Sequence, residues 1–413
     1  MAGPAKVLMV CYFFPPILTS GTSRSIRFAA DLVSKGYEVT VLTVKHSKDT
    51  WINYDGSATP EGVRIVRSRE FNLNGAIRFA FGLFNKPFKI LGIPFKRNHF
   101  LEYLCIPDPH IAWRCLFRGI TEAKKADLLY VSCAPFSAAL KSALIKTFTG
   151  KPLVLDFRDP WTINQYRYTP KLRKPVEKAL EKMVLKKADC LILNTPGTVD
   201  YYKTRFSGLE DKLVYIPNGY EKILEAKPER EKGPFTIVHT GSFYGSRSPI
   251  NLLQALVELD NPDIEFIHAG VDSEEFPNFE GKVKMTNLGM LPKAEALDLC
   301  RKADLLYLRQ GHEEHIDRYV AVGAKTYDYL STGLPILAEC PKGDNSDIIA
   351  KHANKSWIIN EDSNVEAIKR AISEAYSQKD QRKVAVKKSF REEFSREVLI
   401  LKLEDVFKKV LNQ

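Results

Sequence analysis

Short apolar runs alternate along the chain with longer amphipathic segments. The runs at 6–13 and 38–44 are rich in valine and leucine, as buried parallel strands require, and 26–36 between them carries its apolar residues at helical spacing. This alternation predicts parallel sheets that helices cover on both faces. Further strand-like runs of the first half lie at 62–68, 126–133, 151–157, 188–195 and 211–219.

A charged stretch with proline and glycine, 221–234, interrupts this series and is typical of a linker. A second series then begins with the run at 235–242. Its other strand-like runs lie at 264–270, 283–289, 303–310, 335–340 and 355–360. We therefore expect an α/β protein with two Rossmann-like, doubly wound domains, 1–220 and 221–394. They should face each other across a cleft, because such sheets bind ligands at the carboxyl ends of their strands. The amphipathic segment 395–413 is predicted to be a helix that packs back on the first domain.

Length and composition agree with two globular domains. The 413 residues exceed what a single core usually covers. No apolar stretch reaches the roughly 18 uncharged residues of a membrane span, and the N-terminus shows neither a basic leader nor a cleavage site. The seven cysteines are scattered, without a CxxC or a cysteine–histidine spacing that suits zinc. We expect a cytoplasmic protein whose cysteines are reduced core residues.

The formal net charge of +11 favours an anionic partner, which can be nucleic acid, lipid or a phosphorylated ligand. A well-solvated surface without such a partner is the alternative. No zinc finger, helix-turn-helix spacing or RNA-binding aromatic pattern occurs, so we expect no nucleic-acid partner and rank a non-enzymatic binding protein low. Segment 71–104 mixes aromatic and basic residues with almost no acid. It suits peripheral contact with the inner face of an anionic membrane, and equally a helical insertion that packs on the first domain.

Five stretches are specific in combination. The first half holds YVSCAPFSAALKSALIK at 130–146, LVLDFRDPWT at 153–162 and IPNGY at 216–220, and the second half holds 238–256 and 323–349. Together they resemble bacterial glycosyltransferases of family 4, which are retaining enzymes with the two-domain GT-B fold. The resemblance implies transfer of a sugar from a nucleotide sugar, most commonly a UDP-sugar. The second domain would then hold this sugar donor, and the first domain the acceptor.

Glycines and cations of the second half suit a diphosphate. In HTGSFYGSRS, Gly241 gives backbone N–H groups room to approach phosphate, and Arg247 can add a charge-assisted contact. Relatives commonly carry an arginine directly after this glycine, where this chain has Ser242. The alternative for Arg247 is a solvated side chain on a loop.

The segment AVGAKTYDYLSTGLPIL is expected to open a helix with Lys325, Tyr327 and Asp328. Lys325 can reach phosphate, and Asp328 can accept both ribose hydroxyls; an ordinary surface acid is the alternative. The family's pair of glutamates, eight positions apart, corresponds here to Val320 and Asp328, so only the second acid is kept. Candidates to replace the first acid at the sugar are Asp317 and Glu314.

Two loops complete the expected binding site for the sugar donor. Met290 and Leu291 lie where relatives recognise the base through the backbone, so side chains there do not reveal the base. Gly21, in the loop after the first strand, allows a close approach of the backbone, and in relatives this loop faces the diphosphate and the acceptor. A structural turn without ligand contact is the alternative for Gly21.

Candidate catalytic residues lie in the first half. Arg158 and Asp159 follow a buried strand at its carboxyl end, where Asp159 can orient an acceptor hydroxyl and Arg158 can stabilise the leaving diphosphate. An Arg–Asp pair that caps the loop is the alternative. His110 is a further polar candidate, and a histidine between prolines is more often structural. In related enzymes the phosphate of the sugar donor is thought to assist the incoming hydroxyl, so a protein base is not required.

These features predict a hexosyltransferase that transfers to a lipid-linked, glycan or secondary-metabolite acceptor, as in polysaccharide biosynthesis. No DxD pattern stands beside a strand end, and related GT-B enzymes neutralise the diphosphate with cationic side chains. We therefore expect no metal ion and no cofactor. The alternative function is a nucleotide-sugar epimerase, since some of these enzymes pair two Rossmann-like domains. Epimerases need several acids and histidines in the cleft, which DFRDPW and Asp328 do not resemble.

Overall fold

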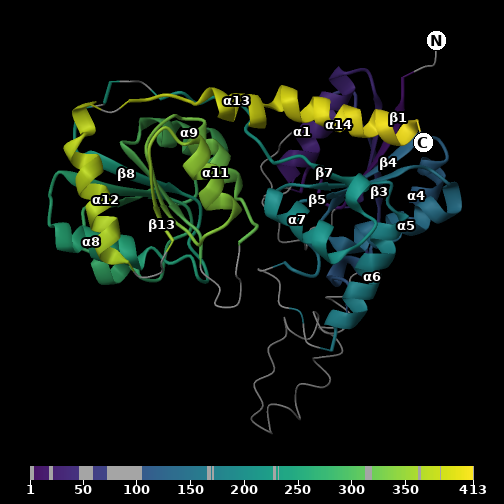
Figure 1. The fold of residues 1–413 in the computed structure, drawn as a ribbon, viewed down its shortest axis with the longest axis horizontal. Helices are drawn as coiled ribbons and strands as arrows, with labels where there is room; N and C mark the ends of the chain where they lie inside the picture. Colours follow the sequence, from purple (N-terminus) through teal and green to yellow (C-terminus); the bar gives the residue numbers. More distant parts are fainter. Residues whose placement is uncertain are drawn as a thin grey trace, which may run out of the picture. The chain divides into compact units, whose positions relative to one another are not determined.

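The computed structural model describes residues 4–17, 22–45, 59–71, 105–164, 169, 172–226, 229–230, 232–311, 319–360, 364–381 and 383–412. The chain forms two compact units, each built on its own sheet (Figure 1). Unit 1 consists of Met1–Asn194, Thr198–Ile216 and Ile400–Gln413. Unit 2 consists of Thr195–Gly197 and Pro217–Leu399.

The sheet of unit 1 has seven parallel strands in the order β3-β2-β1-β4-β5-β6-β7. Val7 on β1 pairs with Val39 on one side and with Leu128 on the other. The order reverses between β1 and β4, so the carboxyl ends of these strands flank a topological switch point. The strands are β1 (Lys6–Cys11), β2 (Glu38–Val44), β3 (Arg64–Ser68), β4 (Leu128–Cys133), β5 (Leu153–Phe157), β6 (Cys190–Leu193) and β7 (Leu213–Tyr215).

Helices cover both faces of this sheet, because successive strand residues point to opposite sides. Leu129 and Val131 join the core beneath α5, while Tyr130 between them contacts Phe28 of α1 and Phe407 of α14 with ring centroids 6.3 and 6.2 Å away. The helices are α1 (Thr22–Ser34), η1 (Pro109–Ala112), α4 (Leu116–Ala123), α5 (Phe136–Thr149), α6 (Lys174–Lys187), α7 (Pro196–Arg205), η2 (Glu210–Lys212) and α14 (Arg396–Leu411).

The C-terminal helix α14 packs on unit 1, which is formed otherwise by the first half of the chain. Phe407 lies against Tyr37, with ring centroids 6.0 Å apart, and Glu404 pairs with Lys35 at 3.6 Å. Lys409 donates to the carbonyl of Asp211 at 2.8 Å. The apolar side of α14 therefore covers the sheet next to α1.

The sheet of unit 2 has six parallel strands in the order β10-β9-β8-β11-β12-β13. Its order reverses between β8 and β11, which gives a second switch point. The strands are β8 (Phe235–Thr240), β9 (Ile264–Ala269), β10 (Met285–Asn287), β11 (Leu305–Arg309), β12 (Ile336–Glu339) and β13 (Ser356–Ile359). The helices are α8 (Ile250–Leu259), η3 (Phe276–Phe279), α9 (Lys293–Lys302), α10 (Ala324–Leu330), α11 (Asp344–His352), α12 (Val365–Ser377), η4 (Lys379–Gln381) and α13 (Lys388–Phe394).

Alternation along β11 divides the core of unit 2 between the two faces. Leu306 and Leu308 belong to a cluster with α9, α10, α11 and α13, whereas Leu305 and Tyr307 belong to one with α8 and α12. Two doubly wound parallel sheets are thus present, and the predicted α/β fold class is confirmed. The seven cysteines are all buried and free, as predicted. None of the helices in the described part of the chain combines the length and the apolar character that crossing a bilayer requires.

Candidate functional site

Most of the residues predicted to bind the sugar donor lie at the carboxyl ends of the strands of unit 2. The loop after β8 carries Gly241, Ser242 and Arg247, and α10 follows β11. Since β8 and β11 flank the switch point, these segments meet where an open parallel sheet normally binds its ligand. The structure therefore gives the phosphate candidates one common location.

Lys325 on α10 points to the end of β8. Its Nζ lies 3.0 Å from Nε2 of His239, a buried residue of β8. Nδ1 of His239 lies 2.8 Å from the carbonyl oxygen of Tyr307, which can only accept, so Nδ1 carries the proton and Nε2 accepts from Lys325. Burial and the positive charge of Arg247 lower the pKa of Lys325 to about 7. Burial and the charge of Lys325 also hold the pKa of His239 well below its usual range, so this ring is neutral.

Gly241 makes the approach of Lys325 possible. Its φ of +106° lies in the region that side chains disfavour, and a Cβ there would lie 2.9 Å from Nζ of Lys325. Gly270 packs directly against this loop, since a Cβ at that position would lie only 2.5 Å from the backbone of Gly241. The backbone of the loop after β8 is therefore in direct reach of the ammonium group.

A buried cation fixes the rest of this loop. The guanidinium of Arg309, at the end of β11, donates to the carbonyls of Ser248 at 3.0 Å and Ser246 at 3.2 Å. It also pairs with the buried carboxylate of Glu339 at 3.1 Å. Arg247 lies between the two anchored serines, and its guanidinium stacks 4.6 Å from the ring of Tyr244. The anchored backbone thus fixes the position from which the Arg247 side chain extends.

Asp328 lies one helical turn after Lys325, on the same face of α10. Burial raises the pKa of this carboxyl group to about 6; Lys293 opposes the shift and Glu221 adds to it. Tyr327 is different: its side chain is fully buried and its ring centroid lies 5.2 Å from that of Phe394. The position of Tyr327 on the helix thus faces the core, and its part in binding the sugar donor stays a prediction.

Buried hydrogen bonds through the amide side chains of Asn345 and Gln310 hold the start of α10 in place. Thr326 donates through its hydroxyl to Oδ1 of Asn345 at 2.7 Å, and Nδ2 of Asn345 donates to Oε1 of Gln310 at 2.8 Å. Gln310 directly follows β11. This chain of contacts ties α10 to the end of the strand, and so it fixes the direction of Lys325.

Ser242 and Met290 approach each other, although they lie far apart in the sequence. The hydroxyl of Ser242 is 4.0 Å from Sδ of Met290 and accepts from the backbone N–H of Val271 at 3.1 Å. Met290 is 64% exposed, and Leu291 beside it is partly buried. The loop predicted to recognise the base therefore borders the loop predicted to bind phosphate.

In unit 1, Arg158 and Asp159 follow β5 directly. The guanidinium of Arg158 donates to the carbonyls of Cys133 at 3.2 Å and Ala134 at 2.7 Å, so it holds the loop after β4. Burial raises the pKa of Asp159, and the charge of Arg158 opposes the shift. These bonds are those of a loop-holding arginine, and the catalytic role of the pair stays a prediction.

His110 lies in η1, close to the carboxyl end of β1. Its Nδ1 is 3.2 Å from Oε1 of Glu70, and the other carboxylate oxygen of Glu70 accepts from the hydroxyl of Tyr12 at 2.6 Å. The ring of His110 also packs on that of Tyr12, with centroids 4.2 Å apart. Glu70 therefore orients the imidazole, and the His110 side chain keeps a third of its surface exposed, at 33%.

The sequence interpretation missed His239 and Glu70. His239 lies within an apolar strand, and Glu70 follows β3 in a polar stretch, so only their partners reveal them. Other candidates lie outside the described residues: Gly21, Glu314, Asp317 and nearly all of segment 71–104. Val320, which stands in place of the family's first acid, lies among the described residues. It packs closely against Gly197, since a Cβ on Gly197 would lie 2.8 Å from one of the Val320 methyl groups.

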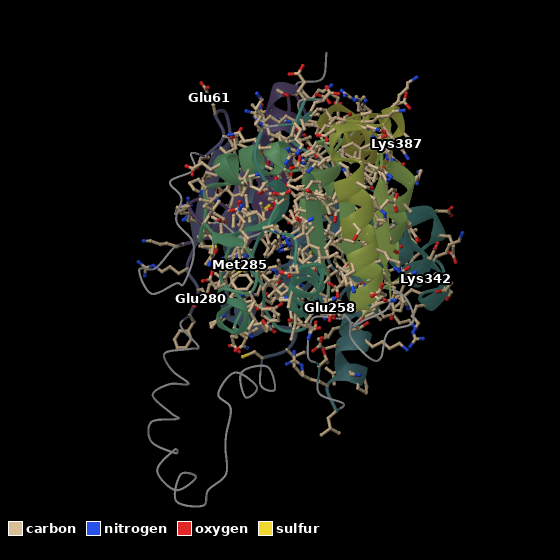
Figure 2. All side chains as sticks on the ribbon, turned by 90° about the vertical axis from the view of Figure 1, so that its left-hand side faces the viewer. Glu61, Glu258, Glu280, Met285, Lys342 and Lys387 are labelled. Atoms are coloured by element: carbon tan, nitrogen blue, oxygen red, sulfur yellow. The ribbon has the colours of Figure 1, made fainter. Side chains whose placement is uncertain are left out.

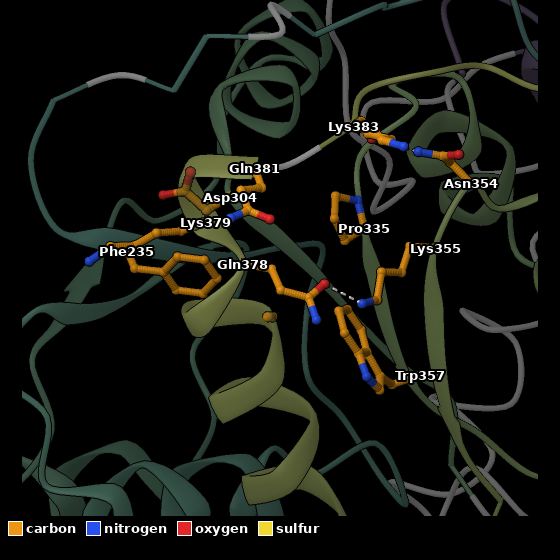
Figure 3. A pocket seen from close by; sticks show the side chains of 11 residues that line it. Phe235, Asp304, Pro335, Asn354, Lys355, Trp357, Gln378, Lys379, Gln381 and Lys383 are labelled. Atoms are coloured by element: carbon orange, nitrogen blue, oxygen red, sulfur yellow. Dashed lines mark hydrogen bonds between the residues drawn. The ribbon is translucent and has the colours of Figure 1, made fainter.

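A cavity of about 300 Å³ opens at the opposite edge of the second sheet (Figure 3). Phe235, Pro335 and Lys355 line it where β8, β12 and β13 begin. Figure 3 shows Lys355 bound to Gln378, and the distance is 2.6 Å. The cavity is thus at the amino ends of the strands, remote from the loops that carry Gly241 and Lys325.

Charges of both signs are mixed on the surface of unit 2. Figure 2 labels Glu258, Glu280 and Lys342, which are all exposed. Glu258 pairs with Lys369 at 3.0 Å.

Comparison with known proteins supports the fold. Residues 22–219 match the model of the glycosyl transferase 4-like domain. A comparison with curated proteins finds no match to the sequence. Among solved structures, HepE of Anabaena in complex with UDP is 12% identical, with a TM-score of 0.66, and the match covers 98% of this chain and 100% of HepE.

Two further solved structures match over almost their whole length. A glycosyltransferase from Rickettsia africae is 14% identical, with a TM-score of 0.65, and the match covers 100% of both chains. WaaG, a glycosyltransferase involved in lipopolysaccharide biosynthesis, is 14% identical, with a TM-score of 0.57, and the match covers 98% of this chain and 95% of WaaG. At these identities the likeness establishes the fold. The chain thus has the GT-B fold, carries a glycosyl transferase 4-like domain at residues 22–219 and is a glycosyltransferase.

Proposed function

We propose that this glycosyltransferase takes a sugar from a UDP-sugar held by unit 2 and transfers it, with retention, to a hydroxyl group of a lipid-linked or glycan acceptor. The observation that carries the proposal is the cationic site at the second switch point. There Lys325 reaches the glycine loop after β8, Arg247 adds a second positive charge, and Asp328 lies one turn further along α10. The two cations thus lie where the diphosphate of a nucleotide sugar would bind, and Asp328 lies where its ribose would follow.

The chemistry of these groups fits a nucleotide diphosphate. An ammonium and a guanidinium beside this loop stabilise a diphosphate as it leaves with negative charge. Asp328 accepts hydrogen bonds from ribose hydroxyls when it is ionised. HepE, which shares the fold, has been solved with UDP and with UDP-glucose, which supports uridine as the base.

The acceptor part of the proposal rests on unit 1. His110, held by Glu70, and Asp159 are the polar groups that can contact an acceptor hydroxyl near the ends of β1 and β5. WaaG acts in lipopolysaccharide biosynthesis, which supports a glycan or lipid-linked acceptor. Such an acceptor places the enzyme at the cytoplasmic side of a membrane, with which segment 71–104 would make peripheral contact.

Calorimetric titration with a panel of nucleotide sugars tests the proposal. We expect one UDP-sugar to bind, and Lys325→Met to weaken its binding by at least tenfold, because the variant keeps the length of the side chain and loses the charge. The matched control is Lys369→Met, at a surface ion pair with Glu258, which should bind normally. Absence of binding by any nucleotide sugar would refute the proposal.

The stereochemical part has its own measurement. With an acceptor identified, proton NMR of the first product formed should show the anomeric configuration of the sugar donor. An inverted product would contradict retention. The epimerase alternative receives no support from the comparisons, and conversion of a UDP-sugar to its epimer without an acceptor would reinstate it.

A further inference from the structure

His239 has no role in the function proposed so far, yet its position is tightly determined. The side chain is 1% exposed. Its ring stacks on Phe243 with centroids 4.3 Å apart and planes 17° from parallel, and Nδ1 donates to the carbonyl of Tyr307. With the ring and the tautomer fixed, the lone pair of Nε2 has one direction, and Nζ of Lys325 lies 3.0 Å from Nε2.

The charged groups around Lys325 do not neutralise an ammonium ion. Arg247, from the loop after β8, is positive and lowers the pKa of Lys325. Burial raises the pKa of Cys300, on α9, to about 12, so it is a neutral thiol. Burial also lowers the pKa of the imidazole of His268, on β9. Within the described part of the chain no carboxylate forms an ion pair with Lys325, and Asp328 on the same helix faces Lys293 and Glu221 instead.

The neutral imidazole of His239 therefore accepts a hydrogen bond from Lys325, which lies close to a second cation, Arg247. This arrangement suits a lysine that stays neutral until an anion arrives. A bound diphosphate favours the ammonium form, because an opposite charge within a few ångströms raises the pKa of an amine. Nε2 of His239 accepts from an amine and, more strongly, from an ammonium group, so the direction of Nζ is the same in both states.

On the basis of the proposed function, we propose that His239 is the positioning residue of Lys325, and that the pair binds the diphosphate of the sugar donor together with one proton taken from the solvent. The proton adds to the lone pair of Nζ, and no other bond forms or breaks. His239 stays neutral and keeps its hydrogen bond to Tyr307. Binding of the sugar donor is thus coupled to pH through Lys325.

Calorimetry in buffers of different ionisation enthalpy counts this proton. The probe is UDP-glucose, whose diphosphate diester does not ionise near neutral pH. At pH 8, one unit above the pKa of about 7, we expect uptake of close to one proton per UDP-glucose bound. At pH 5.5 Lys325 takes up close to none, and a proton is released instead from Asp328, whose pKa is about 6 and which binds ribose in its ionised form. Lys325→Arg should bind with almost no uptake at either pH, because its guanidinium is always charged. Asp328→Asn should keep the uptake at pH 8, since Asp328 is ionised there.

Two amide variants test the positioning role. Glutamine at 239 places an oxygen near the position of Nε2 and keeps an acceptor for Lys325, whereas asparagine places an amide near Nδ1 and keeps the bond to Tyr307. We expect His239→Asn to weaken UDP-glucose binding about tenfold, the effect of about 1.4 kcal/mol for a lost hydrogen bond to a charged group. His239→Gln should stay within about threefold of the wild type. His352→Phe, a buried histidine on α11, is the control for loss of a buried imidazole.

The outcomes separate this inference from the proposed function. Binding of UDP-glucose without proton uptake at pH 8, or with uptake that Lys325→Arg retains, overturns the coupling while the function stands. Equal affinities for His239→Asn and His239→Gln overturn the positioning role. If both variants unfold, the proton count of Lys325→Arg still decides the coupling. Failure of every nucleotide sugar to bind is the outcome that removes the proposed function itself.

Discussion

At the scale of single residues, the site depends on how closely Lys325 can approach the backbone at Gly241. Lys325 and Asp328 were recognisable from the sequence because they open a helix after a buried strand. Tyr327 lies between these two polar residues, and because a helix turns by about 100° per residue its side chain faces the core. His239 was missed because a buried histidine in a strand has no distinguishing spacing. Only the distance to Lys325 reveals it.

Gly241→Ala is expected to abolish most of the binding of the sugar donor. The new Cβ would lie 2.9 Å from Nζ of Lys325 and would occupy a φ of +106°. Gly245→Ala is the matched control, since Gly245 has a positive φ of +56° and no atom within 4 Å of a Cβ. Both variants should lose about 1–2 kcal/mol of stability from backbone strain, measured by urea unfolding. Calorimetry should show a loss of affinity of tenfold or more for Gly241→Ala alone, and equal affinities would contradict the role of Gly241.

The pH dependence of kcat/KM should follow two groups of the free enzyme. Asp328, with a pKa of about 6, must be ionised to accept hydroxyl groups, so activity should fall below pH 6. Lys325, with a pKa of about 7, is charged below that value, so activity should fall above pH 7 as the proton becomes scarce. In a measured profile, Asp328→Asn should lose the acid limb and keep the alkaline one. An unchanged acid limb would show that another group titrates there.

At the scale of elements, the strands were predictable because a strand buried on both faces is apolar along its whole length. All the expected strands form, and the edge strands β7 and β10 are the shortest, with three residues each. An edge strand pairs on one side only, so fewer of its residues complete a ladder. The loop after β5 could not be predicted, because two buried acids of α6 shape it. Trp161 donates to Glu177 at 3.0 Å, and Thr162 donates to Glu181 at 2.5 Å.

Glu177→Ala tests how far α6 supports this loop. The variant removes the partner of the buried Arg173, which is paired at 2.6 Å, as well as the acceptor for Trp161. Breaking a buried pair from one side costs about 3–5 kcal/mol, so urea unfolding should show a loss of that size. Glu392→Ala, on an exposed pair with Lys388, should change stability by less than about 0.5 kcal/mol. A small effect of Glu177→Ala would mean that the loop is held by other contacts.

At the scale of the whole molecule, the fold implies how the leaving diphosphate is neutralised. Lys325 and Arg247 supply positive charge at the loop after β8, so we expect a reaction that needs no divalent ion. Initial rates measured with excess EDTA should equal those with added Mg²⁺, within about twofold. Complete loss of turnover in EDTA, restored by Mg²⁺, would show instead that a metal ion carries this charge.

The helix α14 gives unit 1 an unusual order of assembly. Its residues from Ile400 onward belong to a unit that is otherwise complete at Ile216, and Phe407 covers Tyr37 and Tyr130. During synthesis on the ribosome the sheet of unit 1 is made first. One of its faces therefore stays uncovered until the residues from Ile400 onward have been made. Unit 2 can fold in the interval, since its own segments are finished at Leu399. An N-terminal fragment that stops at Ile216 would expose these aromatic rings and aggregate, whereas a circular permutation that joins α14 directly to unit 1 would not.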